Sequence, residues 1–124
     1  MPANHRAFAD RPDRYAEALD IDSGGDGERW RLAVAGEVDA VTGTQLREAV
    51  VDVLRRHCPR RLEMDLRRVA FLDSAGIRTL LLCHSEAERV TCQLRITDAS
   101  PMVYRTLEIT GLLVHLCVAP CASA

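Results

Sequence analysis

One short stretch near the middle of the chain joins a strand pattern to a helix pattern. The apolar run Leu62 to Leu66 is typical of a strand, whereas Ile77, Leu80 and Leu81 recur at the spacing of one helix face. Between them lies the sequence Phe71-Leu72-Asp73-Ser74-Ala75-Gly76-Ile77. A strand, a polar turn and a helix therefore follow one another directly, which predicts a β–α connection.

The turn carries residue types that suit both a helix start and an anion. Asp73 or Ser74 can cap the helix, because a side-chain oxygen accepts hydrogen bonds from the free amides of the first turn. Gly76 allows another backbone, a phosphate or a partner to approach closely. The amides and the dipole of a helix N-terminus favour negative charge, so a serine at this place is suited to hold a phosphate.

Strand patterns occur on both sides of this stretch. Alternating apolar residues predict strands at 16–22, 29–34, 93–97 and 113–118. Between the first two, the glycine-rich segment 23–27 predicts a hairpin turn.

Helices are predicted between these strands. After a loop at 36–43, a helix is expected at 44–58, capped by Thr42 or Thr44 and ended by Pro59. The helix that begins at Ser74 is expected to run to about residue 88. A further helix is predicted at 100–110, because Ser-Pro is a typical start and Gly111 a typical stop. Alternating strands and helices indicate an α/β fold.

Length and composition indicate one domain. The chain has 124 residues, of which 48% are hydrophobic, and this suits a single compact core. The first 14 residues are polar and contain two prolines, so we expect a flexible N-terminal extension at 1–14. The domain is expected at 15–118, followed by a short tail at 119–124.

Charge and hydropathy exclude several classes of partner. The net charge of −2 gives no electrostatic reason to expect nucleic acid or an anionic membrane. No apolar run approaches the roughly 18 residues that a bilayer-spanning helix needs. The N-terminus lacks a basic-then-apolar signal pattern, so we expect a cytoplasmic protein.

The cysteines do not predict a metal site. The chain has five, and no two are spaced as Cys-x-x-Cys. The one cluster with metal-ligand character is His115-x-Cys117-x-x-x-Cys121, which we interpret as ordinary thiols in a reducing cytosol. We therefore expect neither a metal nor another cofactor.

Catalysis is not expected either. The adjacent pairs His57-Cys58 and Cys83-His84 project about 100° apart on a helix and do not face each other. A hydrolase serine at Ser74 would require the pattern Gly-x-Ser-x-Gly, but Leu72 occupies the first glycine position.

Three segments carry a resemblance to a known family. The stretch from Phe71 to Ile77 resembles the phosphorylation loop of STAS domains, in particular of the anti-sigma factor antagonists. The segment Leu32 to Asp39 resembles the family's first loop, where a Gly-Glu-hydrophobic-Asp run follows a strand, and the strand Leu62 to Leu66 leads into the serine loop as in the family. With compatible spacing, the resemblance covers roughly residues 28 to 118.

The resemblance implies a fold and a function. The fold is a sandwich of a small mixed β-sheet with helices packed mainly on one face. The function is a binding switch: the antagonist binds an anti-sigma factor, often a serine kinase that uses ATP, and a sigma factor is released. The kinase phosphorylates the motif serine and weakens the complex, and a phosphatase restores binding.

The same resemblance assigns roles to individual residues. Ser74 is the phosphoacceptor, Asp39 lies beside it on the docking surface, and Asp73 shapes the loop. We add the hypothesis that Arg78, one helical turn after Ser74, pairs with the phosphate.

Structural interpretations of these residues remain open. Ser74 can be a plain helix cap, Asp39 a solvated turn residue or a cap, Gly76 a site of close helix packing, and Arg78 a solvated side chain. An alternative function is that of a STAS subunit in a transport or stress-signalling assembly, acting as a binding module without sigma-factor control.

Overall fold

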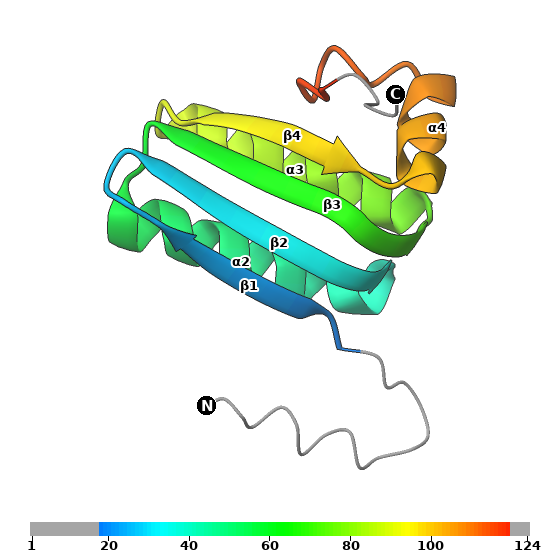
Figure 1. The fold of residues 1–124 in the computed structure, drawn as a ribbon, viewed down its shortest axis with the longest axis horizontal. Helices are drawn as coiled ribbons and strands as arrows, with labels where there is room; N and C mark the ends of the chain where they lie inside the picture. The colour runs from blue at the N-terminus through cyan, green and yellow to red at the C-terminus, as the bar shows by residue number, and fades with distance from the viewer. Residues whose placement is uncertain (1–17, 120–124) are drawn as a thin grey trace.

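The chain forms one four-stranded sheet with two helices across it and a third at its end (Figure 1). The structure is a computed structural model that describes residues 18–119. Its strands are β1 (Asp20–Gly25), β2 (Arg29–Val38), β3 (Arg61–Leu72) and β4 (Gln93–Ala99), in that spatial order. Its helices are α2 (Ala40–His57), α3 (Ser74–Arg89) and α4 (Pro101–Ile109).

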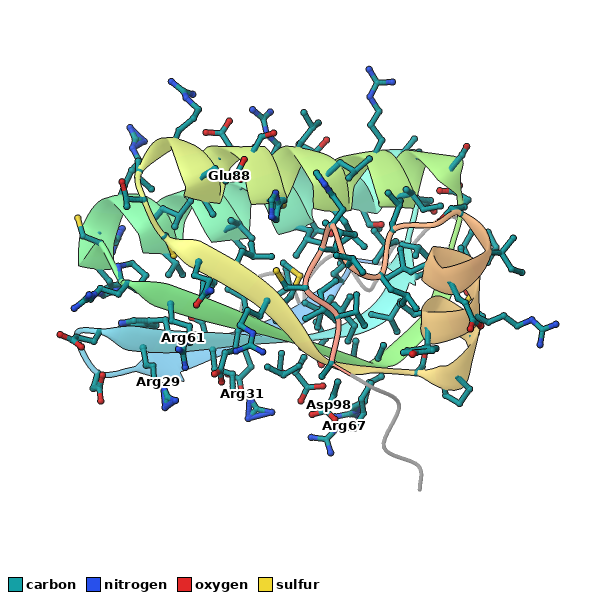
Figure 2. All side chains as sticks on the ribbon, turned by 90° about the horizontal axis from the view of Figure 1, so that it is seen from above. Arg29, Arg31, Arg61, Arg67, Glu88 and Asp98 are labelled. Carbon is teal, nitrogen blue, oxygen red and sulfur yellow. The ribbon has the colours of Figure 1, made fainter. Side chains whose placement is uncertain are left out.

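The sheet is mixed because only its first connection is a hairpin. Strand β1 pairs antiparallel with β2, whereas β2, β3 and β4 are parallel. Parallel neighbours require a crossover, which α2 and α3 supply. Both helices lie on the same face of the sheet (Figure 2), and α4 packs against β3 and β4. The predicted α/β class, with helices mainly on one face, is therefore observed.

Most of the core lies between the sheet and the two crossover helices, and α4 and the segment after it add Leu107 and Leu116. Residues that alternate along the strands point towards the helices, whose apolar stripes face them. The largest fully buried side chains are Leu32, Leu46, Leu62, Met64, Leu66, Leu80, Ile96, Leu107 and Leu116.

The other face of the sheet is polar. Arg31 and Arg67 point away from the helices (Figure 2) and both bind the carboxylate of Asp65, at 2.6 and 3.0 Å. The Asp65 side chain is only 5% exposed. Burial alone raises the pKa of Asp65, but the Arg67 amide and the two guanidinium groups outweigh it and hold that pKa below its ordinary value.

The predicted loop at 36–43 was wrong. Strand β2 continues to Val38, because Gly36 and Val38 stay paired with β3 up to Leu72. Helix α2 then begins at Ala40, capped by Asp39 and not by Thr42 or Thr44. Similarly, β3 is longer than the predicted 62–66, and residues 23–25 of the predicted turn continue β1.

The predicted strand at 113–118 was also wrong. Helix α4 ends near Gly111, whose φ of +77° matches the predicted stop. The chain then turns repeatedly, with one isolated bridge between Val118 and Ile96. Leu116 is fully buried and holds this segment on the core, so its apolar residues serve as an anchor. The predicted extension at 1–14 and most of the predicted tail lie outside the described residues.

Within residues 18–119, no helix combines the length and the hydrophobicity that crossing a membrane demands. The same residues contain no group of three or more potential metal ligands, and Cys121 of the predicted cysteine cluster lies beyond them.

Candidate functional site

Ser74 is the first residue of α3 and is exposed. The cap of the helix is its neighbour Asp73, whose Oδ1 accepts from the Gly76 amide at 2.8 Å. The Ser74 hydroxyl has no hydrogen-bond partner among the described residues. Asp73 therefore does the capping, and the serine oxygen is left open to solvent.

Asp39 occupies the equivalent position on α2. Its Oδ1 accepts from the amides of Val41 and Thr42, both at 2.9 Å, and the Thr42 hydroxyl accepts from the Asp39 amide at 3.0 Å. The hydrogen bond from the Thr42 amide is the main reason why the pKa of Asp39 lies below its ordinary value. The Asp39 carboxylate is thus half-buried, charged at neutral pH and fixed by its own helix.

The two helix starts lie next to each other. Val38 and Leu72, which directly precede the two caps, are register partners in β2 and β3, and the Asp73 amide approaches the Val38 carbonyl oxygen at 3.5 Å. Ser74 and Asp39 are therefore on one edge of the sheet, where parallel strands end and their helices begin. We call Asp39, Asp73 and Ser74 the serine edge.

Gly76 fixes the distance between α3 and the sheet. A Cβ atom at this position would lie 2.5 Å from the Val38 carbonyl oxygen and 2.7 Å from Leu72 Cδ1. Both distances are shorter than real Cβ atoms show, so only glycine fits here without movement of the surrounding atoms. The close-packing interpretation of Gly76 is thus supported.

Arg78 lies one turn after Ser74 and is exposed. No carboxylate of residues 18–119 lies within ion-pair distance of it. Its guanidinium group is consequently available to another anion.

Sequence reasoning missed two apolar residues at this edge. Val41, in the first turn of α2, is 78% exposed, and Phe71, near the end of β3, is 41% exposed. Exposed apolar side chains beside polar ones are common in protein–protein interfaces. Periodicity could not find them, because Val41 fell in the predicted loop and Phe71 precedes the polar turn.

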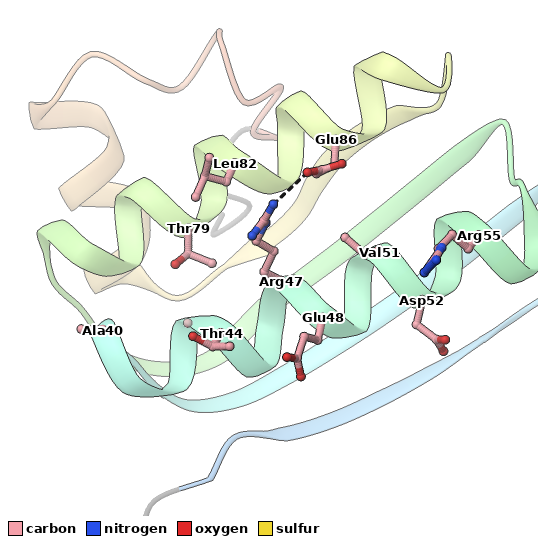
Figure 3. Close-up of a pocket in the computed structure, with 11 residues that line it drawn as sticks. Ala40, Thr44, Arg47, Glu48, Val51, Asp52, Arg55, Thr79, Leu82 and Glu86 are labelled. Atoms are coloured by element: carbon pink, nitrogen blue, oxygen red, sulfur yellow. Dashed lines mark hydrogen bonds and ion pairs between the residues drawn. The ribbon is translucent and has the colours of Figure 1, made fainter.

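A groove of about 530 Å³ runs between α2 and α3 from the same edge (Figure 3). Ala40 and Thr79 line one part of it and the half-exposed Leu82 lies further along. Arg47 crosses the groove to Glu86, with 2.9 Å between Nη2 and Oε2. The groove therefore continues the mixed polar and apolar surface of this edge along α2 and α3.

Comparison with known proteins identifies the family of this fold. A family model described as "Mlab, STAS domain" matches residues 21–116. The chain belongs to the STAS domain family. This STAS domain is 31% identical over 81 residues to an anti-sigma-B factor antagonist of Listeria monocytogenes, covering 65% of this chain and 70% of that one. The resemblance found in the sequence is confirmed.

Solved structures agree. An anti-sigma factor antagonist from Mycobacterium paratuberculosis matches with a TM-score of 0.72 and 25% identity, over 85% of this chain and 88% of that one. The STAS domain of a SulP transporter from Vibrio cholerae matches with a TM-score of 0.57 and 20% identity, over 73% and 71%. The fold is thus found in antagonists and also in transporters.

Proposed function

We propose that this STAS domain is an anti-sigma factor antagonist. It binds an anti-sigma factor that is also a serine kinase, so that a sigma factor is released, and phosphorylation of Ser74 ends the binding. A phosphatase resets the switch. The observation that carries the proposal is the exposed hydroxyl of Ser74, which lies at a helix start beside Asp39 and has no hydrogen-bond partner in the part of the chain that the structure describes.

The serine edge has the composition of a docking surface. Beside it, Val41 and Phe71 expose apolar surface that a partner can bury on binding. Asp39 and Asp73 place negative charges next to this apolar surface. A partner with a matching apolar patch and basic rim fits this edge, since complementary charges favour encounter and fix orientation.

Phosphorylation changes this edge without unfolding it. The Gly76 amide bonds the Asp73 side chain and the Ile77 amide bonds its carbonyl, so the amides of Ser74 and Ala75 remain open to phosphate oxygens. The phosphate brings roughly −1.5 to −2 charges into a surface that already holds two carboxylates. Binding becomes about 100-fold weaker if the added repulsion costs about 3 kcal/mol.

Arg78 has a role in the modified state under this proposal. It projects from α3 one turn beyond Ser74 and has no carboxylate partner among residues 18–119. A guanidinium group at that spacing pairs with the phosphate and stabilises it.

A kinase assay tests the proposal. The purified protein is incubated with ATP and candidate anti-sigma kinases, and its mass is measured. We expect one added phosphate, which Ser74→Ala abolishes. Ser85→Ala is the matched control, because Ser85 is also an exposed serine of α3 but lies three turns from the cap. Labelling that persists in Ser74→Ala would place the acceptor elsewhere.

The transporter match favours a second candidate. As a STAS subunit of a transport or stress-signalling assembly, the domain would be a binding module without sigma-factor control. This candidate predicts no phosphate on Ser74 and no binding of any anti-sigma factor, whereas Ser74→Asp would leave its assembly unchanged.

A further inference from the structure

A second concave surface lies at the end of the sheet opposite the serine edge. It is a hollow of about 620 Å³ where β2, β3 and β4 begin. Three arginines line it: Arg29, Arg60 and Arg61. We call it the arginine hollow. Nothing in the proposed switch uses it.

The arginines are close together, and none of them forms an ion pair with another residue of the described range 18–119. Arg29 and Arg61 are register partners in adjacent parallel strands, so both side chains leave the same face of the sheet. Like charges directly opposite each other destabilise a sheet. Among residues 18–119, no carboxylate lies within 4.0 Å of either side chain or of Arg60.

Arg31, the next arginine of β2 on the same face, has a carboxylate partner that the arginines of the hollow lack among the described residues. Arg31 lies two residues beyond Arg29 and is neutralised by the largely buried Asp65 at 2.6 Å. The sheet thus provides an internal carboxylate for Arg31 and Arg67, whereas no carboxylate of the described residues lies within ion-pair distance of the arginines of the hollow. An external anion would relieve this local repulsion.

Backbone hydrogen bonds fix the segments around the hollow. The amides of Arg60 and Arg61 both donate to the Glu28 carbonyl oxygen, at 2.9 and 3.0 Å, and the Gln93 amide donates to the Arg60 carbonyl oxygen at 2.9 Å. These bonds join the starts of β2, β3 and β4, which surround the hollow. Such preorganisation lowers the entropic cost of binding.

Two acidic residues also line the hollow. The Asp26 carboxylate is engaged in its own turn, where Oδ1 accepts from the amides of Glu28 and Arg29 at 3.2 Å. The Glu28 side chain is exposed and makes no ion pair within the described residues. The lining therefore contains three arginines and two carboxylates, and the carboxylate of Asp26 is hydrogen-bonded to backbone amides of its own turn.

We propose that the arginine hollow binds a small, multiply charged phosphate ligand, with a diphosphate group as the recognised element. Guanidinium forks match phosphate oxygens in geometry and charge. Thr91 and Gln93, which also line the hollow, add neutral hydrogen-bond donors. The hollow of about 620 Å³ lies within the range of roughly 300 to 1,000 Å³ that is typical of small-ligand pockets.

Isothermal titration of the full chain with inorganic pyrophosphate, at constant ionic strength, tests the proposal. We expect saturable binding with a Kd below about 1 mM. ADP is the second arm: tighter binding than pyrophosphate assigns a nucleotide, and equal binding assigns a free diphosphate. If neither binds saturably, the proposal is wrong.

Variants locate the site. Arg61→Ala and, independently, Arg29→Ala should weaken pyrophosphate binding at least tenfold, and Glu28→Gln should strengthen it. Arg105→Ala is the matched control, since Arg105 is an exposed arginine on α4 without an ion pair in the described part of the chain. Thermal unfolding of each variant verifies its fold. An equal loss in Arg105→Ala would mean that net charge alone attracts the anion, and would overturn the proposal.

Discussion

Replacing Gly76 with alanine tests the geometry that joins the two helix starts. The added Cβ would meet the Val38 carbonyl oxygen at 2.5 Å and Leu72 Cδ1 at 2.7 Å. The carbonyl belongs to the sheet and cannot rotate away as a side chain does. The N-terminal turn of α3 must therefore shift, and with it Ser74 moves relative to Asp39.

The size of the effect follows from two opposing terms. Overpacking costs about 1 to 3 kcal/mol, and contact with backbone places this site near the upper end. Alanine is better than glycine in a helix by about 1 kcal/mol. The net loss in unfolding free energy is about 2 kcal/mol, which lowers the urea midpoint by roughly 1 M.

Urea unfolding followed by circular dichroism is the assay. Gly24→Ala is the matched control, because a Cβ at Gly24 would meet no atom within 4 Å and its φ is not positive. We expect that control to stay within about 0.5 kcal/mol of the wild type. If Gly76→Ala were as stable as the wild type, the close contact between α3 and β2 would not exist as described.

Three further predictions concern charge and chemistry. The pKa of Asp39 is lower in the folded than in the unfolded state. The carboxylate therefore contributes to stability above the unfolded pKa of about 4, and this contribution is lost as pH falls from there through the folded pKa. Asp39→Asn should flatten this acid dependence in unfolding experiments. Burial raises the pKa of the Cys83 thiol to about 12, so Cys83 should resist alkylation at pH 8 while the exposed Cys58 reacts, and peptide mass spectrometry distinguishes them. Arg78→Ala should lower the melting temperature of the phosphorylated protein more than that of the unmodified one; equal losses would reject the proposed pairing.

Much of the fold could be predicted because local signals agreed with the tertiary structure. Ser100 caps α4 with Pro101 at its first position, as the sequence indicated, and α3 begins at Ser74. The prediction of a loop at 36–43 was wrong because it depended on tertiary structure. Gly36 to Val38 stay paired with β3 although Gly36 has a φ of +123°, and a single sequence does not reveal the pairing partner of a segment.

The serine edge could be predicted in part. Asp73 and Ser74 stood out because a polar turn joined two clear patterns. Asp39 was recognised only through resemblance, although an aspartate followed three residues later by a threonine is close to a capping-box signature. The exposure of Val41 and the pairing of Arg29 with Arg61 depend on tertiary placement, so neither could be read from periodicity.

Under the proposed function, a phosphate on Ser74 switches docking at the serine edge. The most direct measurement is the affinity of the unmodified and the Ser74-phosphorylated protein for the same anti-sigma factor. We expect phosphorylation to weaken binding about 100-fold, a difference of about 3 kcal/mol. Equal affinities of the two forms would contradict it.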